Sequence, residues 1–277
     1  MGSEEKAKLI IRPGQGRQMI NFRELLEYRD LLYFLVARDL KVRYKQTVLG
    51  GLWAIIQPLF SMAVFTVFFG KLAKMPSDGI PYPVFNFTAM FAWTYLANAV
   101  TGAGNSLITD VNLISKVYFP RLMIPLAPAI AGILDFTIAS VVLAGMLLYY
   151  HIYPTAMILL LPFLLLMMIF TACGAGIFLA ALNAKYRDIR YTIPFMVQLW
   201  MFASPIVYPA SIVPAKYQYI YALNPMVGII EGMRSILLGT VPFPTQNILI
   251  SALVSSLLFI GGIFYFKQAE RYFADII

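Results

Sequence analysis

Long apolar stretches separated by short polar loops make up most of this chain. Each stretch is close to or above the ~20 helical residues that cross a bilayer core ~30 Å thick. The pattern therefore predicts an all-α polytopic membrane protein with six transmembrane helices. The predicted spans cover residues 52–72, 84–108, 122–150, 155–183, 190–208 and 247–266.

Residues 22–46 precede the first span and have a different pattern, in which Leu alternates with charged side chains. This favours an N-terminal amphipathic helix lying in the inner membrane interface. The alternative is a cytoplasmic helix that packs on protein. Residues 1–21 are polar and predicted to be flexible, so the transmembrane domain is expected to cover residues 22–277.

The segment 209–245, between the fifth and sixth spans, is too short for two crossings and too apolar for a plain loop. Asn224-Pro225 is typical of a helix start, and Gly239 of a helix end. We therefore expect an outer, re-entrant helical hairpin here. Glu231 and Arg234 stand three positions apart and can pair on this helix.

The loops sort by charge. Ten Lys and Arg lie in the first 51 residues, two follow the second span, three follow the fourth and two follow the sixth, which makes seventeen of the 21. Cationic loops stay in the cytoplasm during insertion, so both termini of this multi-pass chain are predicted to be cytoplasmic. An even number of spans requires the same arrangement. The net charge of +8 follows from these loops, and favours membrane lipids over nucleic acid as partners.

Composition and motifs exclude several kinds of chemistry. The chain is 60% hydrophobic and 12% charged, which leaves no room for a separate soluble domain. No G-x-x-x-x-G-K-[ST] run is present to cradle ATP. One histidine, one cysteine and no D-x-D predict no metal site. A membrane-bound glycosyltransferase needs a carboxylate cluster, and only Asp110 and Asp188 are candidates.

Asp135 lies near the midpoint of the third span. An ionisable group there costs ~2.5–3.5 kcal/mol on insertion scales, so it needs water or a partner. One interpretation is that Asp135 faces a water-filled path or a subunit contact. The alternative is a carboxyl group bonded to a Ser, Thr or Tyr of a neighbouring helix.

Two spans carry aromatic and amide side chains on one helical face. Aromatic rings stack on the C–H faces of sugars and Gln bonds hydroxyl groups, so the two stripes fit a polysaccharide path. The alternative is aromatic residues that face lipid or pack between helices. The stripes are Trp53, Gln57, Phe60 and Phe68, and Tyr191, Phe195, Gln198 and Phe202.

An ordered set of motifs resembles the permease subunit of polysaccharide ABC exporters, the transporters of O-antigen, capsule and teichoic acid. The resemblance covers about residues 25–270. It is carried by RDLKVRYKQTVLG at 38–50 followed by Trp53 and Pro58, KVYFPR at 116–121, YRD at 186–188, SPIVY at 204–208, and Asn224-Pro225 with Glu231 and Arg234.

The resemblance implies a homodimer with the path at its interface, and a separate nucleotide-binding subunit that carries ATP and Mg and hydrolyses the ATP. This chain is then no enzyme and holds no cofactor. The cargo would be a polysaccharide, O-antigen first, on an undecaprenyl diphosphate carrier. Arg38, Lys41, Arg43 and Lys45 would attract the diphosphate or simply anchor the inner interface.

The resemblance also assigns two moving elements. A short helix at 109–117 would dock on the ATPase, and the hairpin would form an outer gate with Asn224, Pro225, Glu231 and Arg234. The predicted coupling residues are Asp110, Val111, Asn112, Leu113, Ile114, Ser115 and Lys116.

Other functions remain open on the sequence. An ABC exporter of teichoic acid, capsule or a smaller lipid or drug has the same motifs. A secondary transporter would show an internal repeat and paired intramembrane charges, and only Asp135 is present.

Overall fold

The computed structural model describes residues 26–45, 50–116, 119–239 and 241–272, and every regular element in those ranges is helical. The predicted flexible segment 1–21 lies outside the described residues. The main elements are α2 (Arg29–Tyr44), α3 (Trp53–Phe65) with a π-helical continuation (Thr66–Leu72), α4 (Tyr82–Thr109), α5 (Val111–Lys116), α6 (Met123–Tyr149), a 3-10 turn (Ala156–Leu160) leading into α7 (Leu161–Lys185), α8 (Ile189–Phe202), α9 (Gln218–Tyr221), α10 (Pro225–Leu238) and α11 (Thr245–Ala269).

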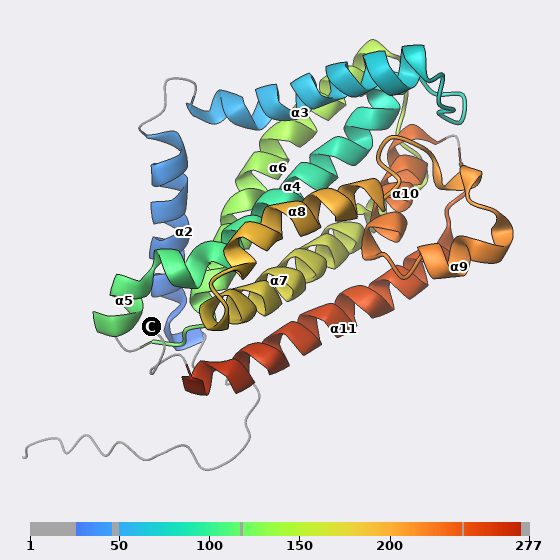
Figure 1. Ribbon diagram of the computed structural model, residues 1–277. Helices are drawn as coiled ribbons and strands as arrows, with labels where there is room; N and C mark the ends of the chain where they lie inside the picture. The colour runs from blue at the N-terminus through green and yellow to red at the C-terminus, as the bar shows by residue number, and fades with distance from the viewer. Residues whose placement is uncertain (1–25, 46–49, 117–118, 240, 273–277) are drawn as a thin grey trace, which may run out of the picture.

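The helices form a bundle with two distinct ends (Figure 1). Helices α4, α6, α7 and α11 run along the bundle, with α5 and the last turn of α11 at one end and α9 and α10 at the other. We call these the α5 end and the α10 end. Arg121 donates a hydrogen bond of 3.4 Å to the Glu270 carbonyl, which ties the start of α6 to the end of α11.

The cations follow this division. The α5 end gathers Lys116, Arg121, Lys185, Arg187, Arg190, Lys267 and Arg271, whereas the α10 end has Lys71, Lys74, Lys216 and Arg234. The fold therefore brings together the loops that the charge pattern grouped.

Four helical stretches within the described residues are long and apolar enough to cross a membrane: 53–72, 123–149, 156–185 and 245–269. These match the first, third, fourth and sixth predicted spans. The chain is thus a helical, multi-pass membrane protein. The second and fifth predicted spans correspond to α4 and α8. Neither helix is both long enough and apolar enough by these measures, so the count of six remains a prediction.

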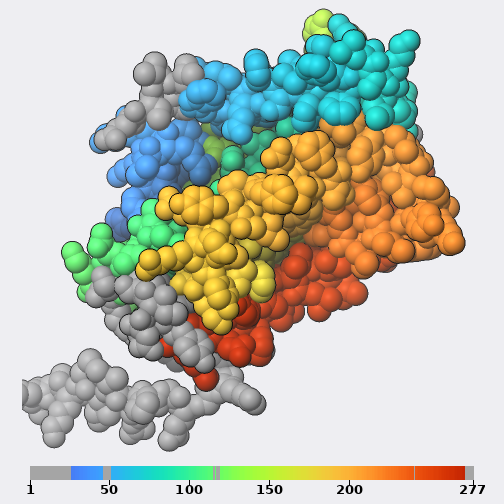
Figure 2. Space-filling view, in the orientation of Figure 1, coloured from blue at the N-terminus to red at the C-terminus, as the bar shows by residue number. Residues whose placement is uncertain are grey.

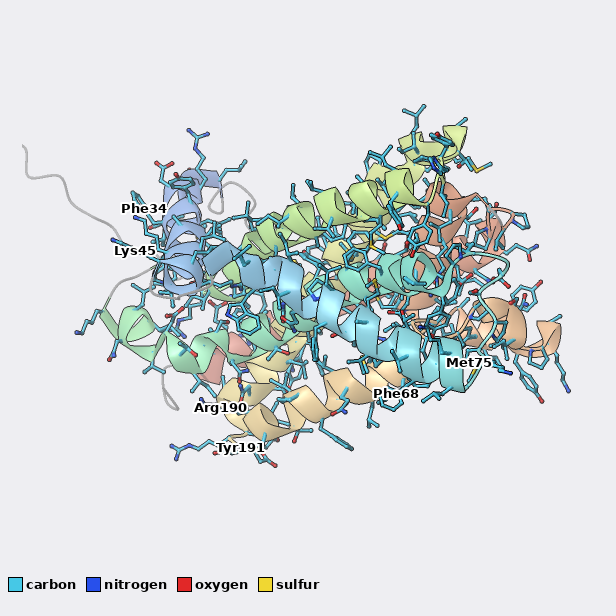
Figure 3. The ribbon with its side chains drawn as sticks, turned by 90° about the horizontal axis from the view of Figure 1, so that it is seen from above. Phe34, Lys45, Phe68, Met75, Arg190 and Tyr191 are labelled. Carbon is cyan, nitrogen blue, oxygen red and sulfur yellow. The ribbon has the colours of Figure 1, made fainter. Side chains whose placement is uncertain are left out.

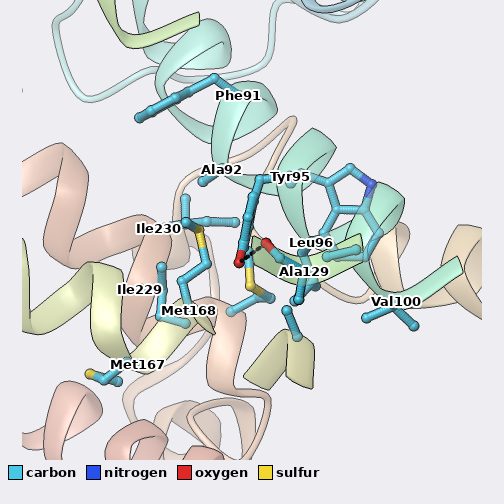
Figure 4. Packing of buried hydrophobic residues seen from close by; sticks show 14 of the residues in the cluster. Phe91, Ala92, Tyr95, Leu96, Val100, Ala129, Met167, Met168, Ile229 and Ile230 are labelled. Carbon is cyan, nitrogen blue, oxygen red and sulfur yellow. Dashed lines mark hydrogen bonds between the residues drawn. The ribbon is translucent and has the colours of Figure 1, made fainter. Parts of the chain in front are cut away.

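Helix α4 is long enough, at 28 residues, but it is more polar than the four stretches named above. Its position inside the protein allows this polarity. It packs against α6, α7 and α10, and most of its residues are buried. Figure 4 shows Tyr95 among Leu96, Met168 and Ile230, with its hydroxyl group donating a hydrogen bond of 3.1 Å to the Ala129 carbonyl of α6. A helix surrounded by protein has partners for such polar groups, which a lipid-facing helix lacks.

Small residues of α7 allow close packing on two sides, as the spacing of Ala172, Gly176, Ala180 and Ala184 predicts for one of them. A Cβ atom at Gly176 would lie 2.6 Å from the Cβ of Ala103 in α4. On its other side, Gly174 faces α11, where a Cβ atom would lie 2.6 Å from the Leu258 carbonyl carbon. Backbones approach this closely only where side chains are missing.

The fifth span is shorter than predicted. The sequence pattern places its end at residue 208, but α8 ends at Phe202 and residues 203–208 are not helical. Pro205 lacks an N–H group and disfavours the helical conformation at Ser204, which explains the early end. Two carbonyl groups of this segment are bonded instead by side chains: Tyr82 donates to Val207 (2.7 Å) and Arg234 to Ile206 (3.0 Å).

Helix α10 begins and ends where the sequence predicts. The Asn224 side chain accepts a hydrogen bond of 3.1 Å from the Met226 N–H, and Gly239 adopts a left-handed conformation with φ 71°. Every residue of α10 is buried, against α4, α7 and α11. The helix is therefore confirmed, whereas its re-entrant insertion into a membrane remains a prediction.

Candidate functional site

One predicted stripe lies on an exposed face of α3 and its π-helical continuation, and the other lies on an exposed face of α8. All eight side chains are exposed in the single chain: Trp53, Gln57, Phe60, Phe68, Tyr191, Phe195, Gln198 and Phe202. Helix α3 buries only Pro58 and α8 only Ile193, so both helices are peripheral. From above, Phe68 lies toward one end of the bundle, and Arg190 and Tyr191 toward the other (Figure 3).

Trp93 and Trp200, which fall off these stripes, pack together. Their rings meet edge to face, 6.1 Å apart. The Trp200 indole N–H donates a hydrogen bond of 2.8 Å to the Asn224 side chain at the start of α10. This contact attaches α8 to the α10 end.

Helices α3 and α8 both contact α4, and part of α4 is visible between them in Figure 2. A half-exposed polar stripe runs along α4, made of Thr94, Asn98, Thr101 and Asn105. This stripe is not among the predicted site residues. The signal was present as polar residues at intervals of four, three and four within an otherwise apolar span.

A cavity of about 350 Å³ opens between α2, α3, α4 and α6. Trp53 and Gln57 of the α3 stripe line it together with Thr94, Asn98 and Thr101 of the polar stripe. The structure thus joins part of the predicted path to the polar face of α4.

Asp135 also lines this cavity, and its partner was not anticipated. It forms an ion pair with Arg43 of α2, with side-chain exposures of 14% and 36% for Asp135 and Arg43. The alternative of a carboxyl group bonded to a Ser, Thr or Tyr is therefore not what the structure shows. The two residues are 92 positions apart, which is why no local pattern revealed the pair.

Helix α2 packs along the first part of α6. Leu35 is buried against Met123 and Ala127, whereas Tyr33 and Phe34 are exposed. One face of α2 therefore packs on protein, as one alternative held, and apolar side chains of another face stay free for lipid.

A second ion pair joins α2 to the predicted coupling element. Arg38 donates two hydrogen bonds of 2.8 Å to the carboxylate of Asp110, the residue immediately before α5. It also bonds Asp39, at 2.9 Å. The bonds to Asp110 raise the pKa of Arg38 above its usual value. The predicted helix at 109–117 is present as α5, over Val111–Lys116.

The four predicted interface cations divide into two pairs. Arg38 and Arg43 have carboxylate partners, whereas Lys41 and Lys45 are exposed on α2. Figure 3 shows Lys45 near the end of α2.

At the α10 end, the expected pair of Glu231 and Arg234 is confirmed and is nearly inaccessible. The two side chains meet at 2.8 Å with exposures of 7% and 2%. Arg234 also stacks on the Phe85 ring of α4, 3.5 Å from its centroid, and bonds the Ile206 carbonyl. This network joins α10, α4 and the segment after α8, because each bond of Arg234 reaches a different element.

Within the described ranges, no group of three or more His, Cys, Asp or Glu side chains could hold a metal ion. The candidate site is therefore a set of surfaces and ion pairs.

Comparison with known proteins relates this geometry to a family. The ABC-2 type transporter family matches residues 30–238. An O-antigen export system permease protein RfbA of Myxococcus xanthus is 28% identical over 258 residues, which covers 92% of this chain and 98% of the relative. An RfbA protein of Klebsiella pneumoniae is 28% identical over 250 residues, covering 90% and 95%. The polysialic acid transport protein KpsM of Escherichia coli is 23% identical over 211 residues, covering 72% and 78%.

The family match spans well over half of the chain, from the start of α2 to the end of α10, and therefore includes the stripes of α3 and α8, the polar stripe of α4 and the network of α10. The chain belongs to the ABC-2 type transporter family.

Proposed function

We propose that this chain is the membrane-spanning subunit of an ATP-driven exporter that moves a lipid-linked polysaccharide, of the O-antigen class, across the bacterial inner membrane. The named relatives support the cargo class, since both RfbA proteins cover at least 90% of the chain. The carrier would be undecaprenyl diphosphate. ATP and Mg would bind a separate nucleotide-binding subunit, because this chain has no phosphate-binding loop.

The observation that carries the proposal is the combination of the exposed stripes of α3 and α8 with the polar stripe of α4. Helices α3 and α8 present aromatic and amide side chains outward, and Thr94, Asn98 and Thr101 of α4 lie near the α3 stripe. Two copies of the chain would close these faces around a path for the glycan. In such a homodimer, side chains that are exposed in one copy would face the cargo or the other copy.

The topology we propose has six spans, α3, α4, α6, α7, α8 and α11, with both termini in the cytoplasm. At 1.5 Å per residue, α8 reaches only about two thirds of a ~30 Å core. The non-helical segment 203–208 would complete the crossing. Such backbone is tolerated at membrane depth only where protein satisfies it, and Ser204 to Val207 are buried with bonds from Tyr82 and Arg234.

The α5 end would face the cytoplasm, since seven of the described cations lie there and four lie at the α10 end. We propose that α5 docks on the ATPase and that Arg38 and Asp110 pass its movement to α2. Lys41 and Lys45 would meet the carrier diphosphate or anionic lipid. The buried α10 would form the re-entrant outer gate, with Asn224, Pro225, Glu231 and Arg234 holding it in place.

Deletion of the gene in its host tests the function. We expect surface polysaccharide to be lost and the lipid-linked polymer to accumulate inside, with both restored by the wild-type chain. Unchanged surface polysaccharide would contradict the proposal. A cysteine at Asn112, in a chain whose buried Cys173 is replaced by Ala, should also cross-link to the ATPase.

A further inference from the structure

The cavity between α2, α3, α4 and α6 contains two polar atoms that the fold leaves unused. Oδ1 of Asp135 and the hydroxyl oxygen of Tyr44 are buried, and neither has a hydrogen-bond partner among the described residues. Both residues line the cavity. Buried polar atoms without partners are costly, so native structures usually fill such positions with a bonded group. Both atoms are covered by neighbouring atoms, so a ligand in the cavity would bond them after a small rotation of the two side chains.

The charges of the cavity are balanced. Arg43 and Asp135 pair with each other, and no other charged side chain of the described residues lines the wall. A diphosphate needs unneutralised cations, which this wall does not provide. The cavity is therefore suited to a neutral ligand that carries hydroxyl groups.

The remaining walls fit the same ligand. The half-exposed Trp53 ring borders the cavity, and Gln57 and Asn98 contribute amides that donate and accept hydrogen bonds. Phe91 and Phe136 stack with centroids 4.7 Å apart and provide an apolar wall. A mixture of aromatic surface and a few convergent polar groups is typical of small-ligand sites.

A second cavity shows the contrast. It measures about 570 Å³ between α4, α7, α8 and α11, and its wall is apolar apart from the Trp200 indole, with residues such as Phe178, Met196 and Leu257. Such a wall accepts a hydrocarbon chain and gives no reason for sugar binding. The cavity between α2, α3, α4 and α6 therefore differs from this second cavity in the polarity of its wall as well as in size.

We infer that the cavity between α2, α3, α4 and α6 binds one short, uncharged sugar segment of the exported chain, with Asp135 and Tyr44 bonding its hydroxyl groups and Trp53 covering a ring face. Its volume of about 350 Å³ is near the lower limit of ligand sites, ~300–1,000 Å³, and so suits a short segment. The inference rests on the proposed function, because it makes this cavity a holding site beside the path.

The test uses the permease–ATPase complex in lipid nanodiscs without nucleotide. The probe is a set of oligosaccharides of one to four repeat units, prepared by partial hydrolysis of the host's own surface polysaccharide. Tryptophan fluorescence and the ligand-induced rise in melting temperature report binding. We expect saturable binding to the wild type that inorganic pyrophosphate does not compete away.

Tyr44→Phe is the decisive variant, because it removes only the unpartnered hydroxyl group. We expect oligosaccharide affinity to fall roughly three- to tenfold, the effect of one lost hydrogen bond, with no loss of thermal stability in the absence of ligand. Tyr149→Phe is the matched control, since Tyr149 is exposed and far along α6 from the cavity, and its affinity should equal that of the wild type. Gln57→Leu should weaken binding as well.

Three outcomes would overturn the inference: no oligosaccharide binding by a complex that exports polysaccharide in cells, equal affinity in wild type and Tyr44→Phe, or displacement of the sugar by pyrophosphate. The first leaves the proposed function standing, because export itself is then observed. If deletion of the chain does not affect surface polysaccharide, the proposed function fails independently of this cavity.

Discussion

Helix α11 and the pair α3 and α8 all expose large apolar side chains, but the chemistry of their exposed faces differs. The exposed face of α11 is aliphatic over most of its length, with Leu249, Leu253, Leu257 and Ile260, and an aromatic ring only near the end, at Phe264. The faces of α3 and α8 combine aromatic rings with Gln57 and Gln198. Lipid tails are as apolar as Leu and require no amide. The difference therefore indicates lipid around α11, and a partner or cargo around α3 and α8.

The largest effect, a difference in the amount of folded protein, should come from placing one charge on the exposed face of α11 and, separately, one on that of α3. Leu257→Arg sits at the middle of α11, where an Arg facing lipid costs ~2.5–3.5 kcal/mol on insertion scales. We expect a clear loss of folded protein in the membrane, measured by fluorescence-detected gel filtration. Phe60→Arg near the middle of α3 should leave folded protein close to the wild-type amount and reduce export. Equal losses of folded protein at the two positions would remove the contrast.

A smaller effect should come from the inner face of α11, which packs on α7. Gly262→Ala places a Cβ atom against the carbonyl oxygen of Gly174, so we expect a loss of about 1–3 kcal/mol from overpacking. Gly261→Ala is the control next to it, since nothing lies within 4 Å of a Cβ atom there. Melting temperatures of the two variants give the comparison. Identical melting temperatures would show that the two helices are not fixed at this crossing.

The smallest effect on stability, with an effect on transport, is expected for ring removal. Phe60→Leu combined with Phe202→Leu should change stability by no more than about 0.5 kcal/mol, because both rings are exposed. Export should nevertheless fall severalfold, as measured by the surface polysaccharide that accumulates after induction. Phe264→Leu on α11 is the matched control and should export normally. A defect in the control as large as that of the double variant would contradict the assignment of faces.

Local rules were sufficient for several elements. The start of α10 at Asn224-Pro225, its end at Gly239 and the pair of Glu231 and Arg234 all depend on residues within one or two turns of each other. The four most apolar helices were predicted for the same reason, because hydropathy alone reports contact with lipid.

Features that depend on tertiary structure were not predictable in this way. The early end of α8 is stable because Tyr82 and Arg234 bond its carbonyl groups from other helices. The pairs of Arg38 with Asp110 and Arg43 with Asp135 join residues 72 and 92 positions apart. The polar stripe of α4 also depends on tertiary structure. A span surrounded by protein does not need to be uniformly apolar, and hydropathy does not show which span is surrounded.

The central claim is that the exposed faces of α3 and α8 meet the glycan, and a photoreactive amino acid tests it directly. Benzoylphenylalanine is placed at Phe60, Phe202 or Leu253 in cells that are exporting polysaccharide, and the irradiated chain is probed for attached polymer. We expect polysaccharide adducts from Phe60 and Phe202, and lipid adducts alone from Leu253 on α11. Adducts with lipid alone at all three positions, in cells that display normal polysaccharide, would contradict the account.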